Sequence, residues 1–461
     1  MRPRSLSDVA RAVDGTLVGP DAEVRSVAID SREVSDGSLF VALPGERTDG
    51  HRFVDAAFAA GAAGALVADG HEGAGPTVRV AATGDALLRL AADERASMTA
   101  RVVAITGANG KTSTKDLAAA VSARRLRTHA SPGSFNNEIG LPLTLLGAPG
   151  DAEVVVAELG ARRLGDVKLL AGVARPDVVV VTNVGVAHLE VFGSWASIVE
   201  ASAEPVDALD AGGVAILNAD DAVVRGYAQR CAGRVVMFGV SARRDALEPD
   251  PPDVRAEHVA LGPDGRATFR LATAVAQADV RLPVPGEHMV SNALAAAAVG
   301  LELGVPLAVA AEAISSASVS RWRMETFTNA DGVRVVNDAY NANPESTAAA
   351  IRTARWIAGK GRLLAVLGEM AELGEIAEEE HERVGELAAR VRVDRLITLG
   401  AAARAIARAA IREGMDPADV VTYDDVHEAT ADVRGSAAAG DVVLCKGSRV
   451  AGLERVAEAL R

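Results

Sequence analysis

Near-continuous apolar runs alternate with helix-length segments through the middle of the chain. The runs are rich in Val, Ile, Leu and Ala, and they lie within 101–106, 153–159, 176–185 and 212–221. A strand in a parallel sheet is covered by helices on both faces, so its sequence is apolar throughout rather than alternating. The pattern therefore predicts an α/β architecture built on a parallel sheet that is buried on both faces.

The same alternation returns after residue 320. Apolar runs separated by Ala-rich segments occur at 333–338, 362–369, 394–400, 419–425 and 441–448. Residues 376–392 have the spacing of one amphipathic helix. The stretch 234–285 lacks the alternation, and we expect a small antiparallel insert there. The region up to about residue 98 mixes short strand-like runs with turns, and its pattern is too irregular to predict a fold.

Composition narrows the class of protein. The chain has 461 residues, of which 49% are apolar and 24% charged, as in soluble proteins of roughly two to four domains. A net charge of −14 argues against a general nucleic-acid surface, which needs clustered Lys and Arg. The N-terminus lacks the apolar stretch of a signal peptide, and no apolar run is long enough to span a bilayer. Cys231 and Cys445 form no metal-ligand spacing, and two cysteines so far apart suit a reduced compartment, so we expect a cytoplasmic protein.

A glycine-rich loop follows the first central strand. The segment "AITGANGKTSTK" (104–115) resembles the phosphate loop G-x-x-x-x-G-K-S/T, but Ile105 stands where that pattern has its first glycine. The two glycines that are present allow a tight turn with backbone N–H groups pointing inward, at the start of a helix. Lys111 can reach phosphates, and the Thr112 hydroxyl can bind Mg²⁺. The alternative is an ordinary strand-to-helix turn, which Gly-Lys-Thr at a helix start disfavours.

Two more polar side chains follow central strands. Glu158 lies near the end of the run at 153–159, and His188 follows the run at 176–185. Ligands bind at the carboxyl ends of parallel strands, so both side chains are candidates for a Mg²⁺ site together with Thr112. A surface acid explains Glu158 alone equally well, and a lone His is more often structural. Only their joint placement favours a metal site.

Polar residues near later turns are weaker candidates. Asn292, near the start of an Ala-rich helix, could hydrogen-bond an adenine edge, although its spacing alone favours a simple helix N-terminus. Asp338 could take ribose hydroxyls, and Asn341 and Asn343 suit tight turns. Arg323 and Lys446 lie near turns, where each could equally be a solvated surface charge.

Together these segments resemble the Mur ligase superfamily over nearly the whole chain. The segments that carry the resemblance are "DSREVSDGSLFVALPGERTDGHRFV" (30–54), "TGANGKTSTK" (106–115), "GSFNNEIGLPLTLL" (133–146), "NVGVAHLEVFGS" (183–194), "GEHMVSNALAA" (286–296), "NDAYNANPES" (337–346), "LGEMAELG" (367–374) with His381, and "KGSR" (446–449). The "DAYNANP" and "GEMAELG" segments are similar to the members that add a D-alanyl-D-alanine dipeptide. The D-N-P-R motif of the diaminopimelate-adding members is absent, as are the signatures of folylpolyglutamate synthetase.

The resemblance implies three domains. They are a small α/β N-terminal domain (1–98) that holds a UDP-linked substrate, a central P-loop ATPase-like domain with a parallel sheet (99–318), and a Rossmann-like C-terminal domain (319–461). The implied enzyme uses ATP and Mg²⁺ to join D-alanyl-D-alanine to UDP-N-acetylmuramoyl-tripeptide through an acyl phosphate. We expect it to be a monomer, without a nucleic-acid partner and without membrane insertion.

The same resemblance implies roles for individual residues. Those assigned to the nucleotide are Gly107, Asn109, Gly110, Lys111, Thr112, Ser113, Asn292, Arg323 and Asp338. Those assigned to the other substrates are Ser31, Arg32, Asn136, Asn137, Asn341 and Lys446. Thr112, Glu158 and His188 are assigned to Mg²⁺, and Lys111, Glu158 and His188 to catalysis.

One position departs from the superfamily. A lysine fourteen residues after the histidine commonly carries a carbamate that supports a second Mg²⁺, and this chain has Ser202 there. Serine cannot form that carbamate, so we hypothesise that Glu200 or Glu204 helps to hold the second metal. The alternative is that this helix has lost its metal role, so that Mg²⁺ is held more weakly or the enzyme is inactive. Two alternative functions stay open at this point. One is a sister ligase that adds another amino acid or a glutamate chain, and the other is a non-catalytic nucleotide-binding relative.

Overall fold

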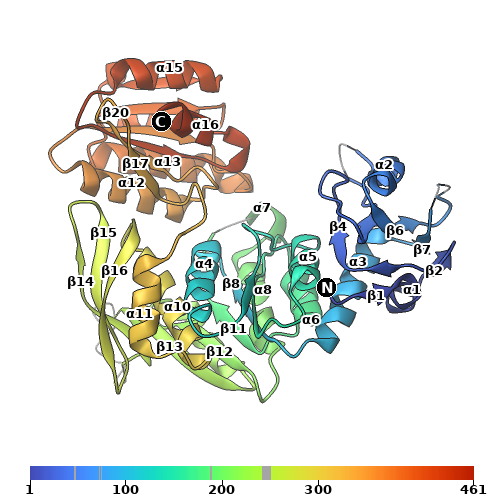
Figure 1. Cartoon of the computed structure of the whole chain (residues 1–461). Coiled ribbons are helices and arrows are strands. Elements are labelled where there is room, and N and C mark those ends of the chain that lie inside the picture. The colour runs from blue at the N-terminus through green and yellow to red at the C-terminus, as the bar shows by residue number, and fades with distance from the viewer. Residues whose placement is uncertain (46–47, 72, 74, 187–188, 241–250) are drawn as a thin grey trace.

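Three large sheets follow one another along the described part of the chain (Figure 1). The computed structural model describes residues 1–45, 48–71, 73, 75–186, 189–240 and 251–461. Among the helices that it describes, none has the length and apolar character needed to cross a membrane. The α/β class with three sheet-bearing units is as predicted, whereas the boundaries placed after residues 98 and 318 stay a prediction.

The central sheet is the largest. Its strand order is β16-β15-β14-β13-β12-β11-β8-β10-β9. The strands are β8 (Arg101–Thr106), β9 (Thr128–Ala130), β10 (Val154–Glu158), β11 (Val178–Val181), β12 (Val214–Asn218), β13 (Arg234–Val240), β14 (Val254–Leu261), β15 (Arg266–Ala272) and β16 (Gln277–Pro285). All neighbours from β9 to β14 are parallel. This confirms the parallel sheet that the continuous apolar runs predict.

The stretch 234–285 is predicted to be a small antiparallel insert, but its strands β13 to β16 continue the central sheet. Strand β13 pairs in parallel with β12, and β14 pairs in parallel with β13. Only β14, β15 and β16 pair antiparallel, with alternating buried and exposed residues along β15. An antiparallel segment can leave one face to solvent, so its sequence loses the continuous apolar character although the sheet goes on.

Helices cover both faces of the central sheet. On one face lie α4 (Lys111–Ser122), α10 (Met289–Glu302) and α11 (Leu307–Ser316), and on the other lie α5 (Gly140–Gly147), α6 (Asp166–Ala174) and α8 (Trp195–Asp207). Helix α10 is almost entirely buried, which its run of alanines permits because small side chains let it pack closely against the strands. The two buried faces give the two large apolar clusters of the chain's first part.

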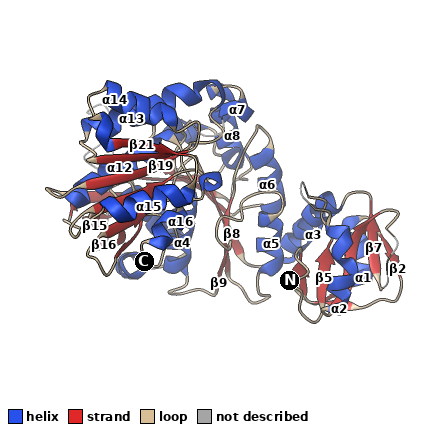
Figure 2. Cartoon of the chain, turned by 90° about the horizontal axis from the view of Figure 1, so that it is seen from above, coloured by secondary structure: helices blue, strands red, loops and turns tan. Residues whose placement is uncertain are grey.

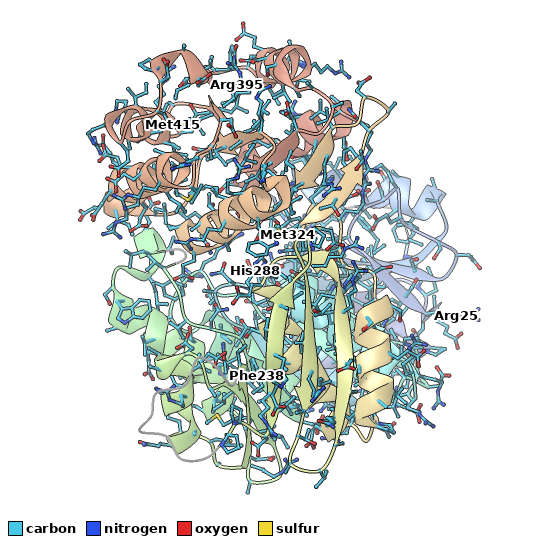
Figure 3. The ribbon with its side chains drawn as sticks, turned by 90° about the vertical axis from the view of Figure 1, so that its left-hand side faces the viewer. Arg25, Phe238, His288, Met324, Arg395 and Met415 are labelled. Carbon is cyan, nitrogen blue, oxygen red and sulfur yellow. The ribbon has the colours of Figure 1, made fainter. Side chains whose placement is uncertain are left out.

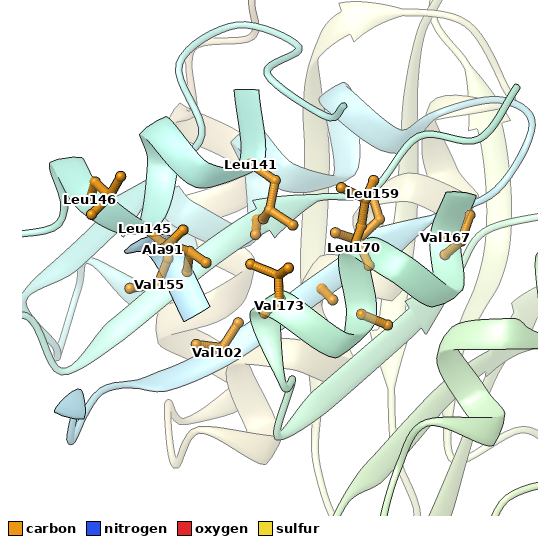
Figure 4. Close-up of a cluster of buried hydrophobic side chains, with 14 of the residues drawn as sticks. Ala91, Val102, Leu141, Leu145, Leu146, Val155, Leu159, Val167, Leu170 and Val173 are labelled. Carbon is orange, nitrogen blue, oxygen red and sulfur yellow. The ribbon is translucent and has the colours of Figure 1, made fainter. Parts of the chain in front are cut away.

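The N-terminal sheet is joined to the central sheet by shared apolar packing. Its strand order is β2-β7-β6-β5-β4, with bounds Thr16–Val18, Thr77–Val80, Ala62–Ala68, Ser38–Val41 and Ser26–Ala28, and its helices are α1 (Leu6–Val13), α2 (Val54–Ala59) and α3 (Thr83–Ser97). A two-residue strand β1 (Arg4–Ser5) pairs with β3 (Glu23–Val24). Side chains of α3, including Ala91, pack in one cluster with Leu145 of α5 and Val102 of β8 (Figure 4).

The C-terminal sheet has helices on both faces (Figure 2). Its strand order is β17-β18-β22-β19-β20-β21, with bounds Glu325–Thr328, Arg334–Asn337, Val442–Lys446, Leu363–Gly368, Arg395–Leu399 and Val420–Tyr423, and only β17–β18 is antiparallel. Its helices are α12 (Pro344–Ala358), α13 (Ala377–Arg390), α14 (Arg404–Arg412), α15 (Val426–Ser436) and α16 (Glu454–Ala459). Helix α13 confirms the amphipathic helix predicted at 376–392.

The junction between the central and C-terminal sheets is largely polar. The carboxylate of Asp116 on α4 accepts a hydrogen bond from the backbone N–H of Ser320 at 2.8 Å, and the Trp356 indole donates to the Gly262 carbonyl at 2.8 Å. The apolar clusters of the described residues stop at this junction, with Ile314 on one side and Met324 on the other. Figure 3 places Met324 and His288 where the two parts meet.

The packing at α3 generates a stability prediction. Leu145 of α5 is fully buried in the cluster that α5 shares with α3, so Leu145→Ala should lower the free energy of unfolding by about 2–5 kcal/mol. Val275 is 94% exposed, and Val275→Ala should change it by less than about 0.5 kcal/mol. Chemical denaturation monitored by circular dichroism measures both. Equal effects of the two substitutions would show that the α3 interface does not contribute to stability.

Candidate active site

The phosphate loop lies between β8 and α4, as the sequence predicts. Gly107 and Gly110 have φ angles of +131° and +82°, which side-chain-bearing residues rarely adopt. A Cβ atom on Gly107 would lie 2.1 Å from Thr182 Oγ1, and one on Gly110 would lie 2.2 Å from Asn292 Oδ1. Both positions therefore require glycine for conformation and for space. Asn292, which is 5% exposed, closes over the loop from the first turn of α10.

Lys111 folds back over this loop. Its Nζ donates to the carbonyl oxygens of Gly107 at 2.6 Å and Ala108 at 3.3 Å. Burial lowers the pKa of Lys111, and the nearby carboxylate of Glu158 partly opposes that shift. The hydrogen bonds of the Lys111 ammonium group go to neutral carbonyl oxygens. A phosphate group in the loop would supply the negative charge that stabilises a buried cation.

Glu158 is the buried acid of the site. It ends β10, is 1% exposed, and both of its carboxylate oxygens accept hydrogen bonds. Thr112 Oγ1 donates to Oε2 at 2.8 Å, and Asn136 Nδ2 donates to Oε1 at 2.7 Å. A carboxylate beside a hydroxyl at the end of a phosphate loop is an oxygen set that suits Mg²⁺. Within the described part of the chain, no three His, Cys, Asp or Glu side chains gather as metal ligands, and His188 lies outside the described residues.

Lys115 fixes the segment that carries Asn136. It is 2% exposed, and its Nζ donates to the carbonyl oxygens of Ser131 and Gly133, both at 2.8 Å. The same ammonium group pairs with Asp116 at 2.8 Å. One turn of α4 therefore orients both Thr112 and the loop that brings Asn136 to Glu158.

A cavity of about 1220 Å³ opens over this group, between the central and C-terminal sheets. Thirteen of the predicted site residues line it, namely Asn109, Gly110, Lys111, Thr112, Ser113, Asn136, Asn137, Glu158, Asn292, Arg323, Asp338, Asn341 and Lys446. Gly107 is not among the lining residues because it packs against Thr182 and Asn183 beneath the loop. Most of the predicted site is thus brought together from segments that lie far apart in sequence.

Ser31 and Arg32 do not join this group. They follow β4 in the N-terminal sheet and are not lining residues of the cavity. The Arg32 guanidinium is 87% exposed and binds the Asp30 carboxylate, with Nε 2.9 Å from Oδ1. The neighbouring guanidinium lowers the pKa of Asp30 to about 2. If Ser31 and Arg32 bind substrate as predicted, they contact a part of it that lies outside the cavity at the phosphate loop.

The C-terminal wall of the cavity is organised around Asp338. Lys446 Nζ lies 2.7 Å from Asp338 Oδ2 and donates to the Asn341 carbonyl at 2.8 Å. The Met324 backbone N–H donates to Asp338 Oδ1 at 3.0 Å. Burial lowers the pKa of His288 on the facing side, and the Asp338 carboxylate partly opposes that shift. Sequence reasoning missed His288, although it directly precedes α10 in a motif that was identified.

The C-terminal part also touches the phosphate loop directly. Asn109 Nδ2 donates to Glu345 Oε2 at 2.8 Å, and Asn343 Nδ2 donates to Asn109 Oδ1 at 2.7 Å. Tyr340 and Ser134 join their hydroxyls across the same boundary. Burial raises the pKa of Glu345. Asn343 was expected only as a turn residue, and it does cap α12, but its contact with Asn109 carries no local sequence signal.

Ser202 and its acidic neighbours are occupied by structural contacts. Ser202 Oγ donates to the Ile198 carbonyl at 2.8 Å, one turn back in α8. Glu200 pairs with Arg230 at 2.7 Å, and Glu204 accepts backbone hydrogen bonds at 2.7 Å from Gly165 and Lys168 at the start of α6. None of the three lines the cavity. The hypothesis that Glu200 or Glu204 holds a second metal is therefore not supported.

Comparison with known proteins agrees with this geometry. Three family models match: "Mur ligase family, catalytic domain" over residues 23–101, "Mur ligase middle domain" over 105–300, and "Mur ligase, glutamate ligase domain" over 322–449. The UDP-N-acetylmuramoyl-tripeptide--D-alanyl-D-alanine ligase of Mycobacterium tuberculosis is 42% identical, with 99% of this chain and 97% of that protein covered. The chain belongs to the Mur ligase family.

Solved structures of that family share the whole fold. MurF from Acinetobacter baumannii matches with a TM-score of 0.87 at 29% identity, over 99% of this chain and 98% of that one. MurF from Thermotoga maritima, solved in complex with ADP, matches with a TM-score of 0.81 at 28% identity, over 95% and 97%. The resemblance to the Mur ligases that the motifs carry is thereby confirmed over the full length of the chain.

The different burial of the two cysteines generates a prediction about their reactivity. Cys445 lies in β22 next to Lys446, is fully buried, and burial raises the pKa of its thiol to about 12. Cys231 is only half-buried. A thiol reagent at mildly alkaline pH should therefore modify Cys231 in the native protein and Cys445 only after unfolding, because the thiolate is the reactive form. Counting modified thiols with and without denaturant measures this, and rapid modification of native Cys231→Ser would contradict it.

Proposed function

We propose that this chain joins UDP-N-acetylmuramoyl-tripeptide to D-alanyl-D-alanine at the expense of ATP. The observation that carries the proposal is the buried Glu158, held by Thr112 at the end of the phosphate loop and facing a cavity that the C-terminal part closes. The full-length relatives named for this reaction support the choice of substrates. The chain is then an amide-forming ligase of peptidoglycan precursor synthesis.

The reaction needs activation of a carboxylate, because its negative charge repels a nucleophile and oxide is a poor leaving group. An oxygen of the tripeptide's terminal carboxylate attacks the γ-phosphorus of ATP, and the bond between that phosphorus and the β-bridging oxygen breaks to release ADP. The amine of D-alanyl-D-alanine then attacks the carbonyl carbon of the acyl phosphate. The carbon–oxygen bond to phosphate breaks, the amine loses a proton, and an amide and inorganic phosphate result.

The residues of this chain bind and shield these groups. Lys111 and the N–H groups of the loop hold the β- and γ-phosphates, so that charge on the transferring group is offset where it develops. Asp338 takes the ribose hydroxyls, and Arg323 reaches the phosphates from the C-terminal side. The contacts of Asn343 and Glu345 with Asn109 bring the C-terminal part over the loop, which excludes water from an intermediate that water would hydrolyse.

Mg²⁺ is the cofactor that this site fits. Thr112 and Glu158 would hold it, with His188 as a third ligand, and the bound ion supplies positive charge against the triphosphate. We further propose a cytoplasmic, monomeric enzyme. An alternative, a nucleotide-binding relative without catalysis, is favoured by one observation only, the presence of Ser202 in place of the family's lysine.

Phosphate release tests the proposed function. With ATP, Mg²⁺ and UDP-N-acetylmuramoyl-tripeptide, release should require D-alanyl-D-alanine, because only the amine completes the turnover. Mass spectrometry should show the pentapeptide product. Nucleotide binding without release in the presence of both substrates would instead establish the non-catalytic alternative. Release with a single amino acid in place of the dipeptide would establish a sister ligase.

The Mg²⁺ assignment is tested by Glu158→Gln. This substitution keeps the shape of the side chain but removes its charge, so turnover should fall by about 100-fold or more and half-saturation should need more Mg²⁺. The matched control is Glu200→Gln, which neutralises an acid paired with Arg230 outside the cavity. Titration of Mg²⁺ in the steady-state assay and in nucleotide binding measures both. An unchanged Mg²⁺ requirement in Glu158→Gln would remove Glu158 from the metal site.

A further inference from the structure

The proposed reaction requires a site for the carboxylate of the incoming dipeptide. This carboxylate lies at the opposite end of the dipeptide from the reacting amine, about 7 Å away when the chain is extended. A cation on the wall of the cavity is the natural partner for such a group. Among the residues that the structure describes, the lysines and arginines that line the cavity are Lys111, Arg162, Arg163, Arg323, Lys446 and Arg449.

Most of these cations are already engaged elsewhere. Lys446 uses its three N–H groups on the Asp338 carboxylate, the Asn341 carbonyl and, at 3.4 Å, the Asp338 carbonyl. Lys111 belongs to the phosphate loop, and the Arg323 guanidinium, stacked on Tyr340 at 4.1 Å, lies close enough to lower the pKa of Lys111. Both are therefore placed to meet phosphates.

The two arginines after β10 belong to the central sheet and not to the C-terminal wall of the cavity. Arg162 and Arg163 lie in the turn between β10 and α6, where Arg163 binds Asp166 at 3.2 Å. Asp85 and Leu88 of the N-terminal helix α3 line the cavity as well, so its wall extends from the C-terminal sheet to α3. This leaves Arg449 as the cation of the C-terminal wall without an assigned task.

Arg449 is held as a flat, oriented group. Its guanidinium stacks 4.4 Å from the centre of the Trp322 ring, and its Nη1 lies 2.9 Å from the Glu454 carboxylate. Its side chain is 53% exposed, so the rest of the fork is open. Stacking on Trp322 fixes the plane of the guanidinium, and Glu454 binds one edge of it. Another edge can still donate two hydrogen bonds to a carboxylate.

The surroundings of Arg449 suit a short apolar peptide. Val450 is 73% exposed and lines the same cavity, together with Ala371. Trp322 has a left-handed backbone, with φ of +61°, and its carbonyl accepts a hydrogen bond from Tyr340 N–H at 3.2 Å. The stacking surface for Arg449 is thereby tied to the turn that carries Asp338 and Asn341.

We propose that Arg449 binds the terminal carboxylate of the incoming dipeptide, with Trp322 and Glu454 as its positioning residues. This assignment rests on the proposed function and deepens it. An anchor at the far end of the dipeptide selects length, because a single amino acid cannot reach both the anchor and the acyl phosphate. The apolar surface at Val450 receives the methyl group beside the anchored carboxylate.

The test compares D-alanyl-D-alanine with its C-terminal amide, which lacks the negative charge. The native enzyme should prefer the carboxylate in kcat/KM by about 10- to 100-fold, the range expected for a hydrogen-bonded ion pair. In Arg449→Met the KM for the dipeptide should rise by a similar factor, and the preference over the amide should disappear. The KM for ATP should stay unchanged.

The matched control is Arg321→Met. Arg321 also stacks on Trp322, at 5.6 Å, and pairs with Glu458 at 3.0 Å, but it does not line the cavity. This variant should keep the preference for the carboxylate, which separates a direct contact from a general disturbance of the Trp322 region.

Three outcomes would overturn the assignment. They are a native enzyme that turns over the dipeptide and its amide equally, an Arg449→Met variant that keeps the native preference, and an Arg321→Met variant that loses it to the same extent. Failure of the proposed function itself looks different, because the native protein would then show no turnover that depends on the dipeptide. If Arg449→Met does not fold, Arg449→Lys, which retains the charge but loses the planar fork, should show a reduced preference.

Discussion

The buried carboxylate of Glu158 is the group on which the arrangement of the site depends. An ionised carboxylate removed from water is costly unless it is hydrogen-bonded or paired. Here the donors come from α4 through Thr112 and from the following loop through Asn136. One charge at the end of β10 thus fixes three segments to one another. Lys115 also fixes the loop that carries Asn136, because its Nζ donates hydrogen bonds to two carbonyl oxygens of that loop.

The two neighbours of the central sheet are attached by different forces. The N-terminal sheet shares an apolar cluster with it through α3, whose side chains pack against α5, α6 and β8. The C-terminal sheet contacts it mainly through hydrogen bonds, such as those of Asn109 with Asn343 and Glu345. Replacing a polar contact by hydrogen bonds to water changes the free energy little. Exposing buried apolar surface to water costs free energy in proportion to its area. The C-terminal junction is therefore the one suited to opening and closing around substrates.

The parts of this structure that the sequence predicts are those with a local or periodic signal. Continuous apolar runs predict the parallel sheets, and the glycines with Lys111 and Thr112 predict the phosphate loop. Family motifs predict most of the cavity wall, but not which atoms meet. The contact of Asn109 with Glu345 joins residues 236 positions apart, and the use of all three Lys446 donors depends on the turn at Asp338. The contacts of Glu200 with Arg230, and of Glu204 with the start of α6, depend on where α8 packs. No sequence motif predicts that packing.

The shared packing of α3 also bears on how the chain folds as it leaves the ribosome. The N-terminal sheet is complete by residue 80, yet the partners of α3 include Leu170 and Val173 of α6. The apolar side chains of α3 that pack against α5 and α6 therefore stay exposed to solvent until α6 has been synthesised. The C-terminal sheet, made last, depends on no such partner, since its apolar clusters are drawn from its own residues. Early translation is thus the interval in which this protein most needs protection from aggregation.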